Sequence, residues 1–197
     1  MIWKLSGKCK CYIYETEPSF LFVSFLERTT VDNQLMPYTI YSYVVEAINA
    51  YGSVKSAPIS FRTPAGVPYG MVILTVTNIQ AKSARFQWNP PSIMNGPLLR
   101  YVLYSTKNET RQEHWVGQDL QVTLQTLVPF TRYLFHVDTC TSGGCLTSEP
   151  VTFPTMSAVP EGMAAPIVMP VNNTALNISW KPPAFPNGTV LSFFVIG

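Results

Sequence analysis

The sequence predicts an all-β protein, a tandem array of small β-sandwiches of which one is complete and two are partial. Short sequence motifs of mixed composition recur at a constant offset of 92 residues. The matched stretches are 35–41 with 127–133, 63–71 with 155–163, 88–91 with 180–183, and 95–96 with 187–188. Such a period is too long for a solenoid unit and fits one small β domain per repeat. Hydrophobic residues at 47% and aromatic residues at 13% are ample for its core.

The register of the repeats predicts three domains. A complete domain occupies residues 65–155, while residues 1–64 hold only later strands and residues 156–197 only earlier ones. Residues 1–34 match their counterparts poorly, and are expected to be either an atypical variant or sequence foreign to the array. The chain is thus expected to begin and end inside domains. Because the two partial domains are complementary, the tail of one molecule is expected to complete the head of the next, giving head-to-tail oligomers.

The complete repeat is expected to contain six short strands and no helix. Runs of β-forming residues are separated by Pro, Gly and Asn, and no helical period of useful length is present. The expected strands are residues 71–76, 84–88, 98–104, 120–124, 131–139 and 146–153. A Trp after the second run and a Tyr near the start of a later one indicate a two-sheet Greek-key sandwich.

Large apolar residues at repeated positions are the candidate core. Trp88 supplies the largest inward side chain. Tyr133 is expected to form a tyrosine corner, its hydroxyl bonded back to the backbone, with Pro129 shaping the approach to its strand. The expected structural core is Leu35, Pro37, Tyr41, Trp88, Tyr101, Leu103, Leu127, Pro129, Tyr133 and Trp180.

The charge distribution excludes two classes of partner. Only 12% of the residues are charged, and the formal net charge is +2. The 13 basic residues are scattered without a run of Lys or Arg, so neither nucleic acid nor an anionic membrane surface is an expected partner. The longest apolar runs, residues 20–26 and 191–196, have the length of strands and cannot cross a bilayer. Polar residues interrupt the N-terminal stretch, so any export signal is expected upstream.

Four N-glycosylation sequons favour an extracellular location. Their acceptors are Asn108, Asn172, Asn177 and Asn187. Asn177 alternates with apolar residues along its expected strand, so it should face solvent. The alternative is that Asn, Ser and Thr are simply common in β turns.

The cysteines indicate the same compartment. Cys140 and Cys145 flank a Gly-Gly turn, so a hairpin could bring them within disulfide reach, and alternation along the strand predicts that Cys140 lies on the outer face. A zinc half-site is disfavoured because no second Cys pair or His cluster accompanies them. A reduced pair in an intracellular protein is the alternative. Cys9 and Cys11 lie too far apart along one strand to bond to each other, and each is expected to pair elsewhere or stay free.

No enzymatic motif is present, and no catalytic residue, metal or cofactor is expected. His114 and His136 are the only histidines, and neither has a recognisable catalytic context, so both are interpreted as surface residues. Gly143 and Gly144 form a turn rather than a phosphate loop, because no helix start follows. A sandwich filled by its own side chains is not expected to offer a deep pocket.

At these residues the sequence resembles the fibronectin type III domains. The resemblance rests on the Trp-x-Pro-Pro motifs, the Leu-x-Pro-x-Thr-x-Tyr corner and the segment Tyr101-Val102-Leu103. It also rests on Phe61 and Phe153, which lie near the ends of their domains. A narrower resemblance is to repeats that carry a Cys-Thr-x-x-Gly-Cys hairpin, although the first repeat departs from it with Ile48 and Ser53 in the cysteine positions. It implies the extracellular region of a large adhesion protein of sensory cells, one that links membranes or matrix in inner ear and retina.

Two functions from different classes follow. In the first, the repeats are spacers in a long adhesive rod, because linkers of about five proline-containing residues hold neighbouring domains end to end. In the second, a loop of the complete repeat is a receptor site for a ligand. The absence of Arg-Gly-Asp and of Trp-Ser-x-Trp-Ser favours the spacer, since these are signatures of ligand-binding members of the resembling family. The expected partners are adhesion or matrix proteins and the neighbouring repeats.

Overall fold

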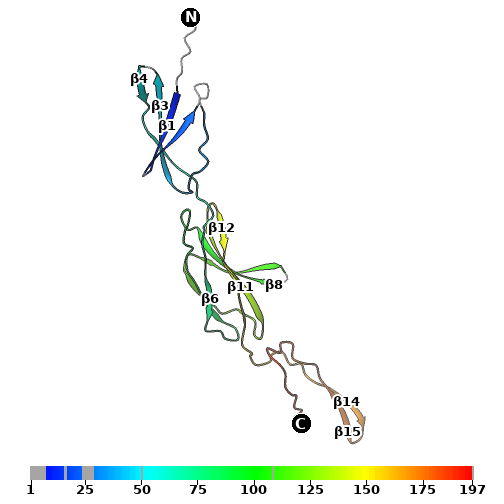
Figure 1. The fold of residues 1–197 in the computed structure, drawn as a ribbon. Helices are drawn as coiled ribbons and strands as arrows, with labels where there is room; N and C mark the ends of the chain where they lie inside the picture. The colour runs from blue at the N-terminus through cyan, green and yellow to red at the C-terminus, as the bar shows by residue number, and fades with distance from the viewer. Residues whose placement is uncertain (1–7, 16, 24–28, 50, 108, 197) are drawn as a thin grey trace. The chain divides into compact units, whose positions relative to one another are not determined.

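The computed structural model describes residues 8–15, 17–23, 29–49, 51–107 and 109–196, and every regular element within them is a β strand (Figure 1). The all-β prediction is confirmed. The chain divides into two compact units. The first comprises Met1–Tyr69, Ser92–Leu99 and Cys140–Leu146, and the second comprises Gly70–Pro91, Arg100–Thr139 and Thr147–Gly197. The boundaries proposed from the repeat register at residues 64/65 and 155/156 stay a prediction.

The first repeat is a five-stranded antiparallel sheet. Its order is β2-β1-β3-β4, with β5 also paired to β3. The strands are β1 (Lys8–Glu15), β2 (Glu17–Val23), β3 (Ile40–Asn49), β4 (Gly52–Lys55) and β5 (Ile59–Arg62).

The poorly matching residues at the start of the chain belong to this sheet. Strand β1 pairs with β3 from Lys8↔Ile48 to Ile13↔Tyr43. It also begins and ends 92 residues before β8 (Arg100–Lys107). The opening stretch therefore keeps the strand positions of the array although its residues differ. Backbone pairing tolerates such exchange, because ladder hydrogen bonds do not depend on side-chain identity.

The complete repeat has two sheets. The smaller sheet has the order β10-β7-β6, and the larger has the order β12-β11-β8-β9 with β13 paired to β11. Besides β8, the strands are β6 (Leu74–Thr77), β7 (Ala84–Trp88), β9 (Thr110–Gly117), β10 (Gln121–Leu124), β11 (Arg132–Thr141), β12 (Gly144–Thr147) and β13 (Val151–Pro154).

The structure corrects the strand prediction in two places. Strand β9 was not expected, because its first four residues are polar and exposed and show no alternation. The single run predicted over 146–153 is divided into β12 and β13. Ser148 lies at the break, where its Oγ accepts a hydrogen bond from Val137 N at 3.0 Å, and Pro150 has no N–H for a ladder.

Aromatic rings join the two sheets of the complete repeat. Phe86 of β7 lies 4.6 Å from Phe135 and 5.7 Å from Phe153 of the larger sheet, measured between ring centroids. Trp88 meets Tyr101 edge-on at 5.7 Å. These contacts bury Phe86 and Phe135 completely, so they form the centre of the sandwich.

The last repeat contributes a two-stranded hairpin. Strands β14 (Ile167–Asn172) and β15 (Ala175–Ser179) pair antiparallel, and all their residues are exposed. Trp180, an expected core residue, is 41% exposed, whereas Trp88 is 6% exposed at the equivalent position. The reason is that two strands alone cannot cover a side chain with a second layer.

Candidate functional site

The tyrosine corner has the same geometry in both repeats that contain it. Met36 N donates to the Tyr41 hydroxyl at 2.8 Å, and Val128 N donates to the Tyr133 hydroxyl at 3.0 Å. The residue before the corner threonine has a left-handed φ in both, +51° at Tyr38 and +50° at Phe130. The repeated Leu-x-Pro-x-Thr-x-Tyr motif therefore specifies the same backbone conformation in both repeats.

One further threonine closes each corner, and the sequence analysis did not assign it a role. Thr155 Oγ1 donates to Val128 O at 2.7 Å and accepts from Thr131 N at 2.9 Å. Thr63 makes the equivalent bonds in the first repeat, at 2.6 and 3.0 Å. The signal was present in the sequence, since Thr63 and Thr155 belong to the 92-residue match.

The Asn-Gly loops hold the linkers. The side-chain amide and the backbone carbonyl of Asn95 bond to the first linker, residues 64–68. Asn95 Nδ2 donates to Val67 O at 2.7 Å, and Gly66 N donates to Asn95 O at 2.9 Å. Asn187 does the same in the second linker, residues 156–160, with Nδ2 donating to Val159 O at 2.8 Å. Both asparagines have a left-handed φ, +54° and +53°, which Asn tolerates better than most residues.

The hairpin between β11 and β12 is closed by a disulfide. Cys140 and Cys145 are joined, with an S–S distance of 2.04 Å and a Cα–Cα distance of 4.0 Å. Cys140 is nevertheless buried, with an exposure of 1%, although its expected place on the outer face had suggested an exposed side chain. Both sides of the larger sheet are covered at this end of β11, where Asp138, Thr139 and Thr141 are also buried. The side chains of Cys9 and Cys11 lie outside the described part of the chain.

A buried carboxylate organises the outer side of the larger sheet. Asp138 Oδ2 lies 2.7 Å from Arg111 Nη1, and Asp138 Oδ1 accepts from Thr147 Oγ1 at 2.7 Å. The Arg111 guanidinium stacks over the Tyr104 ring at 3.7 Å. Burial and the nearby Asp138 charge raise the pKa of Tyr104. Both carboxylate oxygens of Asp138 are bonded to side chains of other strands of the larger sheet, so the cluster stabilises that sheet.

The histidines occupy more enclosed places than a surface interpretation allows. His114 is half-buried, with Nε2 2.8 Å from Ser105 Oγ and its ring 4.9 Å from that of Phe135. Burial lowers the pKa of His114. His136 is also partly buried and stacks on Tyr104 at 5.2 Å. These contacts with aromatic rings indicate packing roles for both histidines in the larger sheet.

The expected core positions differ in burial between the repeats. Trp88, Tyr101, Leu103, Leu127 and Pro129 are buried, and Tyr133 is half-buried. In the first repeat Tyr41 is buried, Leu35 is half-buried and Pro37 is exposed.

The sequons also differ in environment. Asn172 and Asn177 are exposed, and Asn172 Oδ1 accepts from Thr174 N at 3.0 Å. Asn187 is half-buried, and its Nδ2, the atom that would carry a glycan, is bonded to the linker. Asn108 lies outside the described residues.

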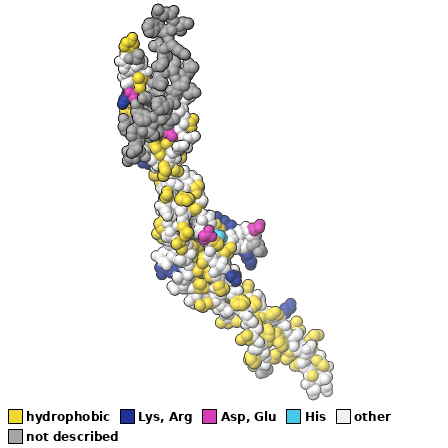
Figure 2. Space-filling view, viewed as in Figure 1, with side chains coloured by type: hydrophobic (Ala, Val, Ile, Leu, Met, Phe, Trp, Pro, Cys, Tyr) yellow, Lys and Arg dark blue, Asp and Glu magenta, His cyan; other side chains and the backbone are white. Residues whose placement is uncertain are grey.

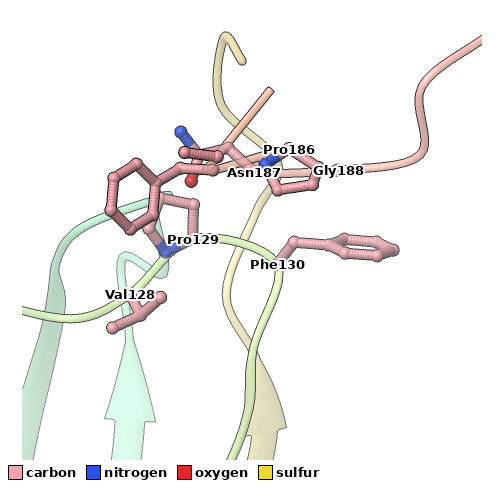
Figure 3. A pocket seen from close by; sticks show the side chains of 8 residues that line it. Val128, Pro129, Phe130, Pro186, Asn187 and Gly188 are labelled. Atoms are coloured by element: carbon pink, nitrogen blue, oxygen red, sulfur yellow. The ribbon is translucent and has the colours of Figure 1, made fainter. Parts of the chain in front are cut away.

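A shallow apolar groove of 380 Å³ lies within the second unit (Figure 3). It is bounded by Val128–Phe130 of the corner and by residues 184–188 of the next repeat. Figure 3 shows Pro129 directed toward Pro186 and Asn187, with the Phe130 ring turned away from them. The eight residues that line the groove include no carboxylate, imidazole or cationic side chain.

Other classes of site are missing from the described residues. On the face drawn in Figure 2, Lys and Arg side chains are scattered rather than clustered. No group of three or more His, Cys, Asp or Glu side chains in the described part of the chain could hold a metal ion. Nor do those residues include a helix able to cross a membrane.

Comparison with known sequences identifies the complete repeat. The sequence pattern of the family named Fibronectin type III domain matches residues 72–154. Residues 72–154 are a fibronectin type III domain. Repeats of this family are not themselves catalytic.

Several cell-surface proteins contain similar stretches. The chain is 34% identical to human usherin over 184 residues, which is 92% of this chain and 4% of usherin. It is 32% identical to the human netrin receptor DCC over 83% of this chain and 12% of the receptor. It is 28% identical to the cell adhesion molecule Dscam1 of Drosophila melanogaster over 98% of this chain and 10% of that protein. The chain thus spans a small part of each of these relatives.

Proposed function

We propose that the chain is a non-enzymatic, extracellular spacer segment of a long adhesion protein of the usherin kind, such as sensory cells carry. The similar stretches in usherin, a cell adhesion molecule and a netrin receptor support an extracellular setting. The disulfide supports it too, because structural disulfides persist in oxidising compartments.

The observation that carries the spacer role is the fixation of both linkers. In the first linker, Pro64 O accepts from Tyr38 N of the preceding corner at 3.0 Å, and Gly66 and Val67 are bonded to Asn95. Only Ala65 lies between the two sets of bonds. A linker held from both sides by hydrogen bonds transmits orientation, whereas a free linker lets domains swing.

The second linker repeats the arrangement. Met156 O accepts from Phe130 N at 3.0 Å, Ala158 N donates to Asn187 O at 2.8 Å, and Val159 O accepts from Asn187 Nδ2. Ser157 is the one residue between. A surface ion pair, Lys82 to Glu161 at 3.1 Å, lies beside this linker, but both side chains are 55% exposed, so it contributes little.

A binding screen separates the spacer from a receptor segment. The full chain is immobilised and tested against a panel of matrix proteins and receptor ectodomains by surface plasmon resonance. The spacer predicts no saturable response. Saturable binding that is lost when an exposed loop residue of the complete repeat, such as Ile93, is replaced by aspartate would contradict it and assign the receptor function.

A further inference from the structure

The first linker lies against the disulfide hairpin as well as against Asn95. Thr141 Oγ1, at the end of β11, donates to Gly66 O at 2.6 Å. A Cβ added to Gly143 at the turn would overlap the backbone of Ala65 and Gly66. The backbone of the linker and the backbone of the turn are therefore in direct contact.

A disulfide and two hydrogen bonds fix the conformation of the hairpin at this contact. The Cys140–Cys145 bond closes its base, and Gly143 N donates to Thr141 Oγ1 at 3.1 Å inside the loop. Cys140 O accepts from Leu99 N at 2.8 Å, which fixes the hairpin to the loop that carries Asn95. The Thr141 hydroxyl thus donates to Gly66 O in the linker and accepts from Gly143 N in the turn.

The glycines explain why the linker can approach so closely. Gly143 does not have a left-handed φ, so its backbone conformation alone would allow alanine. A Cβ on Gly66 would lie 2.8 Å from the Pro37 ring of the preceding repeat. A side chain at Gly66 would therefore displace Pro37, while Asn95 and Thr141 hold the Gly66 backbone by hydrogen bonds.

We propose that the disulfide hairpin of the complete repeat is an intramolecular docking site for the linker that precedes it, with Thr141 and Gly143 as the contact residues. The inference deepens the proposed spacer role, on which its biological meaning rests. The hairpin and Asn95 hold the backbone of residues 65–67 from two directions. The Cys140–Cys145 bond keeps Thr141 and Gly143 in position for this contact.

Amide hydrogen exchange in the full chain tests the docking site. The Gly66 amide, bonded to Asn95 O, reports on the linker, and the Val137 amide, bonded to Ser148 Oγ, reports on the core. Thr141→Val should speed exchange at Gly66 about fivefold, the effect of losing one hydrogen bond. Gly143→Ala should speed it more, because the added methyl displaces the linker. Exchange at Val137 should stay unchanged in both variants.

Ser142→Ala is the matched control, because Ser142 is exposed at the tip of the same hairpin. It should leave exchange at Gly66 as it is in the wild type. Unchanged exchange at Gly66 in both Thr141→Val and Gly143→Ala would overturn the docking site. Equal acceleration at Gly66 and Val137 would also overturn it, because the variants would then act on the whole repeat. This readout is independent of the binding screen, so a ligand could be found while the docking site stands.

Discussion

The two tyrosine corners share their hydrogen bonds but differ in burial. The bonds to the Tyr41 and Tyr133 hydroxyls agree within 0.2 Å, as the distances of 2.8 and 3.0 Å show. Yet Phe61, the last aromatic residue of the first repeat, is 69% exposed, while its equivalent Phe153 is 4% exposed. The corner is specified by the local sequence, whereas burial requires the facing sheet.

The tryptophans sharpen this comparison most. Trp88→Ala should lower the free energy of unfolding of the complete repeat by about 3 to 5 kcal/mol, since a buried Trp is removed. Trp180→Ala should change the stability of the complete repeat far less, because Trp180 belongs to the last repeat and is 41% exposed there. Urea denaturation followed by near-UV circular dichroism measures both. Equal shifts of the urea midpoint in the Trp88→Ala and Trp180→Ala variants would contradict the difference in burial between the two tryptophans.

The corner hydroxyls should give a smaller effect. Tyr133→Phe removes one hydrogen bond and should cost roughly 1 to 2 kcal/mol. Tyr41→Phe should produce a similar loss of local protection, because the bond from Met36 N has the same geometry. The amide exchange rates of Val128 and Met36 are the measurements. If the first corner is unaffected while the second opens, the corner depends on the facing sheet and not on its own sequence.

The half-buried histidine should make the complete repeat less stable in mild acid. Burial lowers the pKa of His114 below its unfolded value of 6.5, so the unfolded chain binds the proton more readily. The contribution to stability is full above pH 6.5 and is lost as the pH falls from there toward the lowered pKa of the folded state. Thermal unfolding between pH 7.5 and 5 should show this slope. The slope should flatten in His114→Gln, and an unchanged slope would refute the assignment.

The equivalent residues Asn95 and Asn187 should contribute similarly to stability but differ in glycosylation. Asn95 and Asn187 make the same bond to a linker carbonyl, but only Asn187 lies in a sequon. Because its Nδ2 is engaged and half-buried, we expect lower glycan occupancy at Asn187 than at the exposed Asn172 and Asn177. Glycopeptide mass spectrometry of the secreted chain, with Asn177→Gln as a control for site assignment, measures the occupancies. Highest occupancy at Asn187 would contradict this expectation.

Periodicity carried most of what the sequence could predict. The 92-residue match located the corners, the Asn-Gly loops and the fold class, because these depend on local backbone chemistry. It missed β9 because that strand is paired along one edge to β8 and carries polar side chains. It also failed to predict the burial of Cys140, since residues on both sides of β11 are buried near its end, from Val137 to Thr141. Burial there depends on covering groups such as Arg111, which are distant in sequence.

The proposed spacer role predicts that neighbouring repeats keep one orientation, and residual dipolar couplings of the full chain in a dilute aligned medium test this central claim most directly. Backbone N–H couplings are measured for the strands of the complete repeat, for β3 to β5, and for β14 and β15. Linkers held at Pro64, Gly66, Met156 and Ala158 predict that one alignment tensor fits all three sets. Separate tensors of clearly different magnitude for the three sets would show that the repeats reorient freely, and would contradict the spacer account.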